Sequence, residues 1–202
     1  EWTNGTVYTV RSSRKEDERF AWEFKLSLWR QPAFEAYLDS FGLPSQSGRP
    51  DYEPDARFGP WVTTGALCPP GAQSYASWST LILEVGLSRG WGHDKGLLDW
   101  KARHWARMPG VRFILCVAVT ERFTSIECKL HTVERDPITN RARRLPDLNP
   151  VPVVEPHTML SFDSRELLGL PAGADIPPIE GQQFPDPTID VDLYKILERL
   201  RR

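Results

Sequence analysis

The sequence predicts an α/β fold, and three segments carry this prediction. Residues 80–85, Thr-Leu-Ile-Leu-Glu-Val, form a short and almost wholly apolar run, which is typical of a buried central strand. Residues 111–119 form a second apolar run that is rich in β-branched side chains. Between these runs, residues 97–108 place Leu, Lys, Trp and Met side chains at helical spacing until Pro109-Gly110 stops the pattern. A helix that separates two apolar strands indicates an α/β sheet.

The N-terminal segments predict helical structure with one ambiguity. Residues 20–28 alternate as a strand does, but Phe20, Phe24 and Leu28 also lie on one face of a helix, so both interpretations stay open. Residues 32–41 predict a short amphipathic helix, because Pro suits a helix start and apolar side chains recur three and four residues apart.

Loops and a hairpin follow from the distribution of Gly, Pro and Ser. Residues 44–54 predict a loop that leads into an extended segment, and residues 65–79 predict a second loop. Residues 123–133 alternate as a strand and pair with the apolar run before them in a hairpin, with Glu121-Arg122 near the turn. Residues 135–156 are polar and contain several prolines, so they predict a surface loop or a flexible insertion.

The C-terminal part predicts one more strand and two helices. Residues 159–162 have the pattern of a strand, and residues 165–168 that of a short helix. Residues 173–187 predict a Pro-rich linker, and residues 191–200 place apolar side chains along one helix face.

Length and composition predict one folded domain. A chain of 202 residues with 40% hydrophobic and 26% charged side chains is long and apolar enough to bury a single core. We expect one domain over residues 1–202. Its core is expected at about residues 50–170, and a Pro-rich linker and a terminal helix at residues 171–202.

Charge and cysteine content narrow the classes of partner and compartment. Lys and Arg number 25 against 27 Asp and Glu, so no global basic field attracts nucleic acid, and any contact with DNA must be local. The three cysteines are too few and too scattered for a disulfide framework or a Cys-x-x-Cys metal site, which predicts free thiols in an intracellular protein, cytoplasmic or nuclear. No apolar run approaches the roughly 20 residues of a membrane span. We therefore expect neither a membrane partner nor a secretion signal.

Two carboxylates form the candidate reaction centre. Glu84 is the one charge in an apolar strand, and a buried carboxylate must be paired, protonated or bound to a metal. Asp55 follows Pro54 directly before an extended segment. If that segment pairs with the strand of Glu84, the two acids form a hard oxygen site suited to Mg²⁺ or Mn²⁺, which can support phosphodiester cleavage. The alternative for Glu84 is a structural salt bridge with Lys95, Lys101 or Arg103.

These residues resemble the PD-(D/E)XK superfamily of restriction-endonuclease-like proteins. The likeness rests on Pro54-Asp55, on residues 81–86 (Leu-Ile-Leu-Glu-Val-Gly), on the Lys-bearing helix and on the apolar hairpin. The chain is most similar to a branch of short, mostly uncharacterised proteins that is widespread in cyanobacteria and also found in fungi, whose fungal members resemble residues 159–168 as well. The resemblance implies a restriction-endonuclease-like core, a mixed central sheet flanked by helices. It also implies that Asp55 and Glu84 bind the Mg²⁺ or Mn²⁺ of a DNA-cleaving nuclease.

The family pattern also includes a lysine two residues after the second acid, where this sequence has Gly86. In the branch named above the lysine comes from the following helix, which implies Lys101 or Lys95. Lys101 is preferred because it shares a helix face with Trp105, whereas Lys95 lies in an expected loop. Such a lysine can orient or deprotonate the attacking water and stabilise charge at phosphorus. Both lysines also fit a solvated helix flank.

Glu127-x-Lys129 also matches the (D/E)xK pattern and offers a rival site. The alternation of its strand predicts a half-exposed edge, with Glu127, Lys129 and His131 on the solvent face, so it ranks below the acid pair. Side chains that could contact nucleic acid near the acid pair are Trp61, Trp78 and Trp91, by stacking, and Arg141, Arg143 and Arg144, by charge. The four histidines are unclustered and lack zinc spacing.

Three functions remain open from the sequence, and the third, an effector or mobile-element accessory domain whose Pro-rich C-terminal region docks a partner, is not distinguished from the second by the sequence. A metal-dependent nuclease requires that Asp55, Glu84 and Lys101 or Lys95 meet around one cavity. A catalytically inactive module that keeps the fold for binding or assembly requires an acid pair neutralised from within. A homodimer and a protein partner fit any of these functions.

Overall fold

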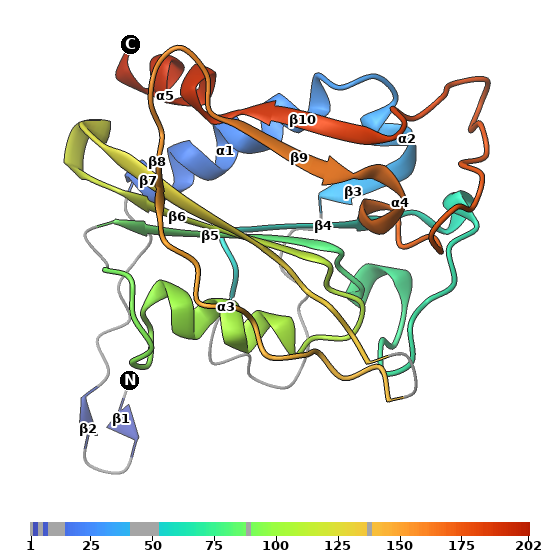
Figure 1. The fold of residues 1–202 in the computed structure, drawn as a ribbon, viewed down its shortest axis with the longest axis horizontal. Coiled ribbons are helices and arrows are strands. Elements are labelled where there is room, and N and C mark those ends of the chain that lie inside the picture. The colour runs from blue at the N-terminus through green and yellow to red at the C-terminus, as the bar shows by residue number, and fades with distance from the viewer. Residues whose placement is uncertain (1, 4–5, 8–14, 41–52, 88–89, 137–138) are drawn as a thin grey trace.

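A mixed sheet of six strands forms the centre of the computed structural model (Figure 1), which describes residues 2–3, 6–7, 15–40, 53–87, 90–136 and 139–202. The strands lie in the order β3 (Leu38–Ser40), β4 (Ala56–Pro60), β5 (Leu81–Leu87), β6 (Phe113–Val119), β7 (Ile126–Thr132) and β8 (Val151–Pro152). The β5 and β6 strands run parallel, and the other neighbours are antiparallel. The predicted α/β class is confirmed, with a mixed central sheet flanked by helices.

The two faces of the sheet carry different layers. Helix α3 (Leu98–Ala106) covers one face, and helices α1 (Lys15–Trp29) and α5 (Leu193–Arg201) lie on the other with the antiparallel pair β9 (Met159–Asp163) and β10 (Thr188–Asp192), as Figure 1 shows. Side chains of β5 alternate between the layers, because successive residues of a strand point to opposite faces. Ile82 joins the cluster under α3, whereas Leu81, Leu83 and Val85 join the larger cluster on the opposite face.

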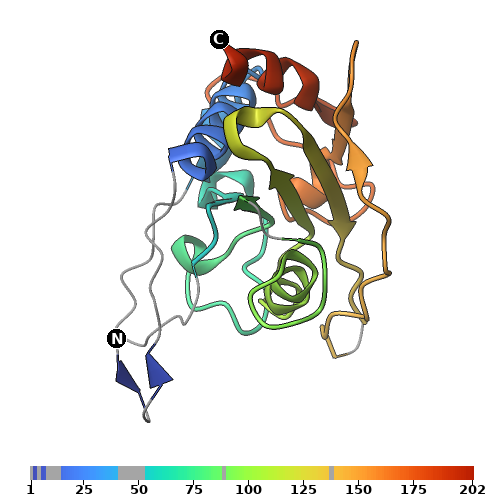
Figure 2. The same cartoon turned by 90° about the vertical axis from the view of Figure 1, so that its left-hand side faces the viewer.

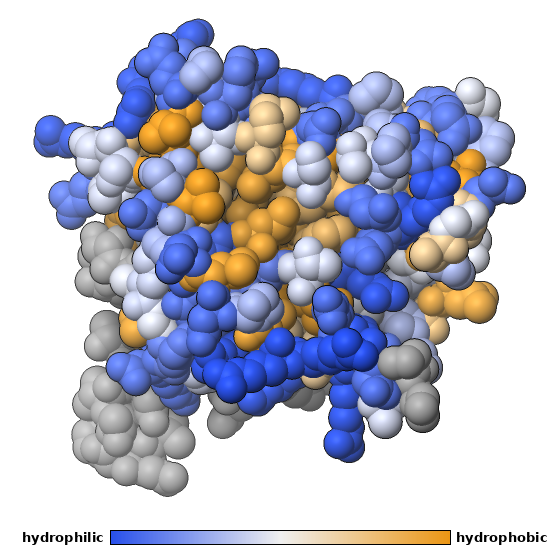
Figure 3. Space-filling model, viewed as in Figure 1, coloured by the Kyte–Doolittle hydropathy of each residue, from blue (hydrophilic) through white to orange (hydrophobic). Residues whose placement is uncertain are grey.

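Apolar side chains also reach the surface near β8 and β9. Figure 3 shows them on the side of the molecule seen in Figure 1, above a hydrophilic region at the level of α3. Val151 of β8 and Met159 of β9 are 53% and 54% exposed, and Val154 between these strands is exposed to a similar degree. The edge of the central sheet is therefore less polar than the surface around α3.

The ambiguous segment at residues 20–28 is helical. Phe20, Phe24 and Leu28 are fully buried along one face of α1, and Trp22 is exposed on another. The hydrophobic core therefore continues into α1, and it also takes in α5, so it extends beyond the expected range of 50–170 on both sides.

The prediction of a helix at residues 32–41 is wrong for the second half of this segment. Helix α2 (Phe34–Tyr37) makes a single turn, and residues 38–40 then form strand β3 instead. Sheet pairing overrides the helical pattern here, since Leu38 lies opposite Pro60 and Ser40 opposite Phe58. The end of the predicted helix and most of the loop predicted at residues 44–54 lie outside the described residues.

The predicted strands and helix of the central region are confirmed. Strands β5, β6 and β7 and helix α3 match the predicted segments, and the turn between β6 and β7 contains the 3₁₀ helix η3 (Glu121–Phe123). The predicted loop at residues 65–79 contains the 3₁₀ helix η2 (Tyr75–Ser77), and η1 (Val62–Thr64) precedes it.

The terminal regions add shorter elements. Strand β9 is followed directly by the one-turn helix α4 (Ser164–Leu167), close to the short helix predicted there. The linker expected at residues 173–187 leads into β10, a strand that the sequence pattern does not predict. Near the N-terminus, β1 (Trp2–Thr3) and β2 (Thr6–Val7) form a separate antiparallel pair.

Trp78 is a core residue and not a substrate-facing one. Its side chain is 2% exposed and packs against two glycines with positive φ. A Cβ atom added at Gly110 would lie 2.0 Å from the indole nitrogen, and one added at Gly169 would lie 2.3 Å from Cζ2 of the same ring. Both glycines therefore allow the close approach of the ring.

Candidate functional site

Strand pairing brings Asp55 next to Glu84. Strands β4 and β5 are antiparallel with Ala56 opposite Leu83, and Asp55 directly precedes Ala56. Asp55 is exposed, and its Oδ2 accepts a hydrogen bond of 2.7 Å from the backbone N–H of Val85. The expected pairing of the two segments is thus observed.

Glu84 is fully buried and contacts two side chains of α3. One carboxylate oxygen accepts a hydrogen bond from the Lys101 ammonium, and Oε1 accepts one of 2.6 Å from the Trp105 indole. Lys101 and Trp105 are four residues apart, so they share one face of α3. This helix thus supplies both partners of Glu84, while Lys95 lies exposed in the turn before it.

Burial dominates the electrostatics of Glu84. Desolvation raises its pKa to about 7, Lys101 counteracts this rise through its charge, and the Asp55 carboxylate adds to it. A carboxyl group with a pKa near neutrality, next to a lysine and a second carboxylate, has the perturbed titration that is frequent at functional sites. Structural ion pairs also produce it.

Glu84 is expected to make stability depend on pH with a definite sign. Its pKa in the folded chain is about 7 against an ordinary value of 4.5, so between these values the folded state binds more protons than the unfolded state. The free energy of unfolding therefore falls as the pH rises through this range, by roughly 3 kcal/mol relative to Glu84→Gln. Urea unfolding of both proteins between pH 4.5 and pH 8 measures this change. A constant difference between the two proteins would contradict a pKa raised by burial.

A second buried ion pair lies beside the first. The register places Glu84, Cys116 and Lys129 in one row across β5, β6 and β7. The Lys129 ammonium binds Oδ1 of Asp99 at 2.7 Å, and Oδ2 of Asp99 accepts a hydrogen bond of 2.7 Å from the backbone N–H of Gly92. Helix α3 thus places an acid over Lys129 and a base over Glu84.

The prediction that Glu127, Lys129 and His131 form a solvent face is wrong. Lys129 and His131 are 6% and 3% exposed, and Glu127 is half-buried. Asp99 of α3 and the ring of Trp91, 4.5 Å from the Lys129 ammonium, cover this part of β7. The Trp91 indole also donates a hydrogen bond of 2.9 Å to Glu127. The (D/E)xK pattern of Glu127 and Lys129 therefore belongs to a buried polar layer that continues from Glu84.

The remaining nucleic-acid candidates are on the surface. Trp61 is exposed, and its indole donates to the backbone oxygen of Glu35. Arg141, Arg143 and Arg144 are exposed, and the last two pair with acids of their own region, Glu134 and Asp147.

Two residues of the buried polar layer were missed as site residues. Asp99 and Trp105 both lie on α3 with Lys101. Trp105 is four residues from this lysine, which places the two on one helix face, and this spacing is the signal in the sequence that could have identified it. Asp99 is two residues from Lys101, a spacing that does not place it on that face.

The donor set matches a hard divalent cation in its chemistry. Asp55 and Glu84 offer carboxylate oxygens, the ligands that Mg²⁺ and Mn²⁺ prefer. Within the described ranges, however, no group of three His, Cys, Asp or Glu side chains is arranged to hold a metal ion. Each Glu84 oxygen already accepts one hydrogen bond, from Lys101 or from Trp105, so a cation at Glu84 would have to use the remaining lone pairs of the carboxylate.

Comparisons with known proteins add no assignment. No family model matches the chain, and neither a curated protein nor a solved structure matches it. In the described part of the chain, no helix has the length and apolar character needed to cross a membrane. The chemistry of the site therefore rests on the geometry of Asp55, Glu84 and α3.

Proposed function

We propose that this chain is a metal-dependent nuclease with a restriction-endonuclease-like core, which hydrolyses phosphodiester bonds of DNA. The observation that carries the proposal is the contact of Lys101, from α3, with Glu84 of β5, beside Asp55 at the start of β4. Three elements thus supply the two acids and the lysine that such a site needs.

Each side chain has a separate role in this proposal. Asp55 and Glu84 would hold Mg²⁺ or Mn²⁺, which when bound lowers the pKa of a water molecule and polarises the phosphoryl oxygen. Lys101 is buried, so its positive charge acts in a medium of low dielectric constant, where it stabilises negative charge more strongly than in water. Trp105 fixes the orientation of the Glu84 carboxylate through its indole N–H.

The test is cleavage of labelled single- and double-stranded DNA with Mg²⁺, with Mn²⁺ and with EDTA. We expect metal-dependent cleavage that Asp55→Asn reduces by at least about 100-fold, a loss typical for removal of a catalytic group. Asn keeps an acceptor for the Val85 N–H, so the variant should fold. Asp175→Asn replaces an acid elsewhere on the chain and serves as the matched control. If cleavage survives in both Asp55→Asn and Glu84→Gln, the proposed nuclease site is wrong.

A second candidate function has its own supporting observation. Glu84 is 0% exposed and both of its oxygens already accept hydrogen bonds, so the acid is neutralised from within. This is the arrangement expected of a catalytically inactive module that keeps the fold for binding DNA, a second copy or another protein. Calorimetric titration with Mn²⁺ separates the two functions. Heat that disappears in Asp55→Asn supports the nuclease, and absence of heat supports the inactive module.

A further inference from the structure

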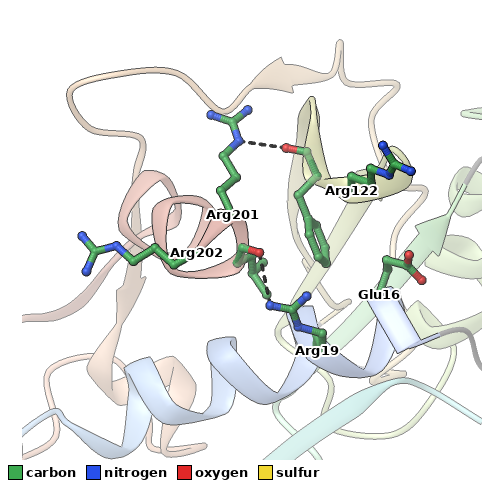
Figure 4. A pocket seen from close by; sticks show the side chains of 7 residues that line it. Glu16, Arg19, Arg122, Arg201 and Arg202 are labelled. Atoms are coloured by element: carbon green, nitrogen blue, oxygen red, sulfur yellow. Dashed lines mark hydrogen bonds between the residues drawn. The ribbon is translucent and has the colours of Figure 1, made fainter.

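Four arginines line one open pocket at the end of α5, and their side chains point in different directions (Figure 4). The pocket has a volume of about 330 Å³ and is formed by α1, η3 and α5. Its lining residues are Glu16, Arg19, Arg122, Phe123, Leu200, Arg201 and Arg202. One glutamate among four arginines gives the pocket a strong positive charge, although the whole chain has a formal net charge of -2.

Two of the arginines are held in place by backbone oxygens. Arg201 donates through Nε to the carbonyl of Phe123 at 2.9 Å and through Nη2 to that of Thr124 at 2.8 Å. Arg19 donates to the carbonyl of Leu200 at 3.2 Å, and its guanidinium lies 5.6 Å from the Phe123 ring centroid. Carbonyl groups position a guanidinium without cancelling its charge, and each guanidinium has five N–H donors.

The arginines of this pocket are not held in ion pairs by carboxylates of the described residues. Within the described ranges, none of Arg19, Arg122, Arg201 and Arg202 forms an ion pair with a carboxylate. Arginines elsewhere do so, as in the pairs Arg165–Asp186 and Arg199–Glu23. The pocket therefore offers guanidinium groups to an anion from solution.

The backbone at the rim of the pocket is strained. Arg122 and Phe123 have φ values of 58° and 54°, a left-handed conformation that is unfavourable for side chains of this size. Phe123 is buried, while Arg122 is exposed at the rim. Strain of this kind is concentrated at functional sites.

We propose that this pocket binds a backbone phosphate of a nucleic acid. Guanidinium groups match phosphate oxygens in charge and in fork geometry. The inference rests on the proposed function. Asp55 precedes β4, which is antiparallel to β5, so it lies on the side of the sheet toward which β5 runs. The η3 helix follows the end of β6, which runs parallel to β5, so the pocket lies on that side as well, with α1 and α5 on the face opposite α3. Figure 2 faces this side, with η3 and the end of α5 above α3. A strand bound at Asp55 can thus be held at a second, remote phosphate.

The test is binding of a fluorescent oligonucleotide in EDTA, where cleavage does not interfere. Arg122→Asn/Arg202→Gln removes two exposed guanidiniums that line the pocket, and Asn tolerates the left-handed backbone at position 122. We expect at least a tenfold loss of affinity, and a salt slope that decreases by about 1 for each phosphate that is no longer neutralised. The control, Arg30→Gln/Arg107→Gln, removes the same charge from two exposed positions outside the pocket and should change affinity less than about twofold.

Each other outcome is decisive. An equal loss of affinity in both double variants would indicate general electrostatic attraction and would contradict phosphate binding at this pocket. A third outcome is that the unaltered chain binds inorganic pyrophosphate, the double variant does not, and neither binds the oligonucleotide. The ligand of the pocket would then be a free phosphate compound, which contradicts the proposal of a nucleic acid. Cleavage is measured with metal and binding in EDTA, so failure of cleavage and failure of this pocket are distinguishable.

Discussion

Lys101→Met is expected to lower the free energy of unfolding by about 3–5 kcal/mol at pH 7.5, the usual cost of breaking a buried ion pair. The variant leaves Glu84 at 0% exposure with the Trp105 indole but without its cation. The carboxyl group must then either remain charged in an apolar layer or take up a proton. Urea unfolding followed by circular dichroism measures the loss, and the loss should be smaller at acidic pH, where Glu84 is protonated.

A double-mutant cycle identifies the cause of this loss. Glu84→Gln/Lys101→Met buries no charge, so it should recover most of the stability that Lys101→Met loses. Lys95→Met is the matched control, because Lys95 is exposed in the turn before α3 and its replacement should change stability by less than about 0.5 kcal/mol. Equal effects of Lys101→Met and Lys95→Met would mean that the ion pair with Glu84 does not stabilise the fold.

Gly110→Ala is expected to be destabilising by about 3 kcal/mol or more. The new methyl group would lie 2.0 Å from the Trp78 indole nitrogen and 2.7 Å from Cγ of Pro69. Gly169 lies close to the six-membered part of the same ring, because a Cβ atom added there would lie 2.3 Å from Cζ2, so the ring is confined at a second place. Thermal and urea unfolding of the variant measure the cost.

The variant Gly173→Ala separates the energetic cost of this contact from the cost of backbone strain. Gly173 has a φ of 75°, close to the 78° of Gly110, but a Cβ atom there would meet no heavy atom within 4 Å. Its replacement should therefore cost only the left-handed conformation, about 1 kcal/mol. If the two alanine variants lost equal stability, packing of Trp78 against Gly110 would not explain the effect.

Elements with a strong local pattern could be predicted from the sequence. Strands β5 and β6 are continuous apolar runs, and α3 has a clear stripe that ends at Pro109, so local pattern and tertiary structure agree. Residues 20–28 fit two periods, and packing against the sheet and α5 decides for the helix. Strand β10 has an alternation of buried and exposed residues, but it is five residues long and follows a Pro-rich segment, which obscures it.

The candidate site could be predicted only in part, for a physical reason. Asp55, Glu84 and Lys101 stand out because each is a charge in an informative local context. The pairing of Asp99 with Lys129 depends on where α3 lies on the sheet, and this placement is a long-range property. Alternation along β7 therefore indicates a solvent face, although helix α3 covers it.

The packing of α1 against α5 has a consequence for how the chain folds during its synthesis. Phe20, Phe24 and Leu28 belong to the same core cluster as Leu197 and Leu200, near the opposite end of the sequence. On the ribosome, part of the apolar face of α1 thus remains without its partner until α5 has emerged from the exit tunnel. This apolar surface can aggregate or bind chaperones while it is exposed, and native packing of α1 is completed only after α5 has been translated.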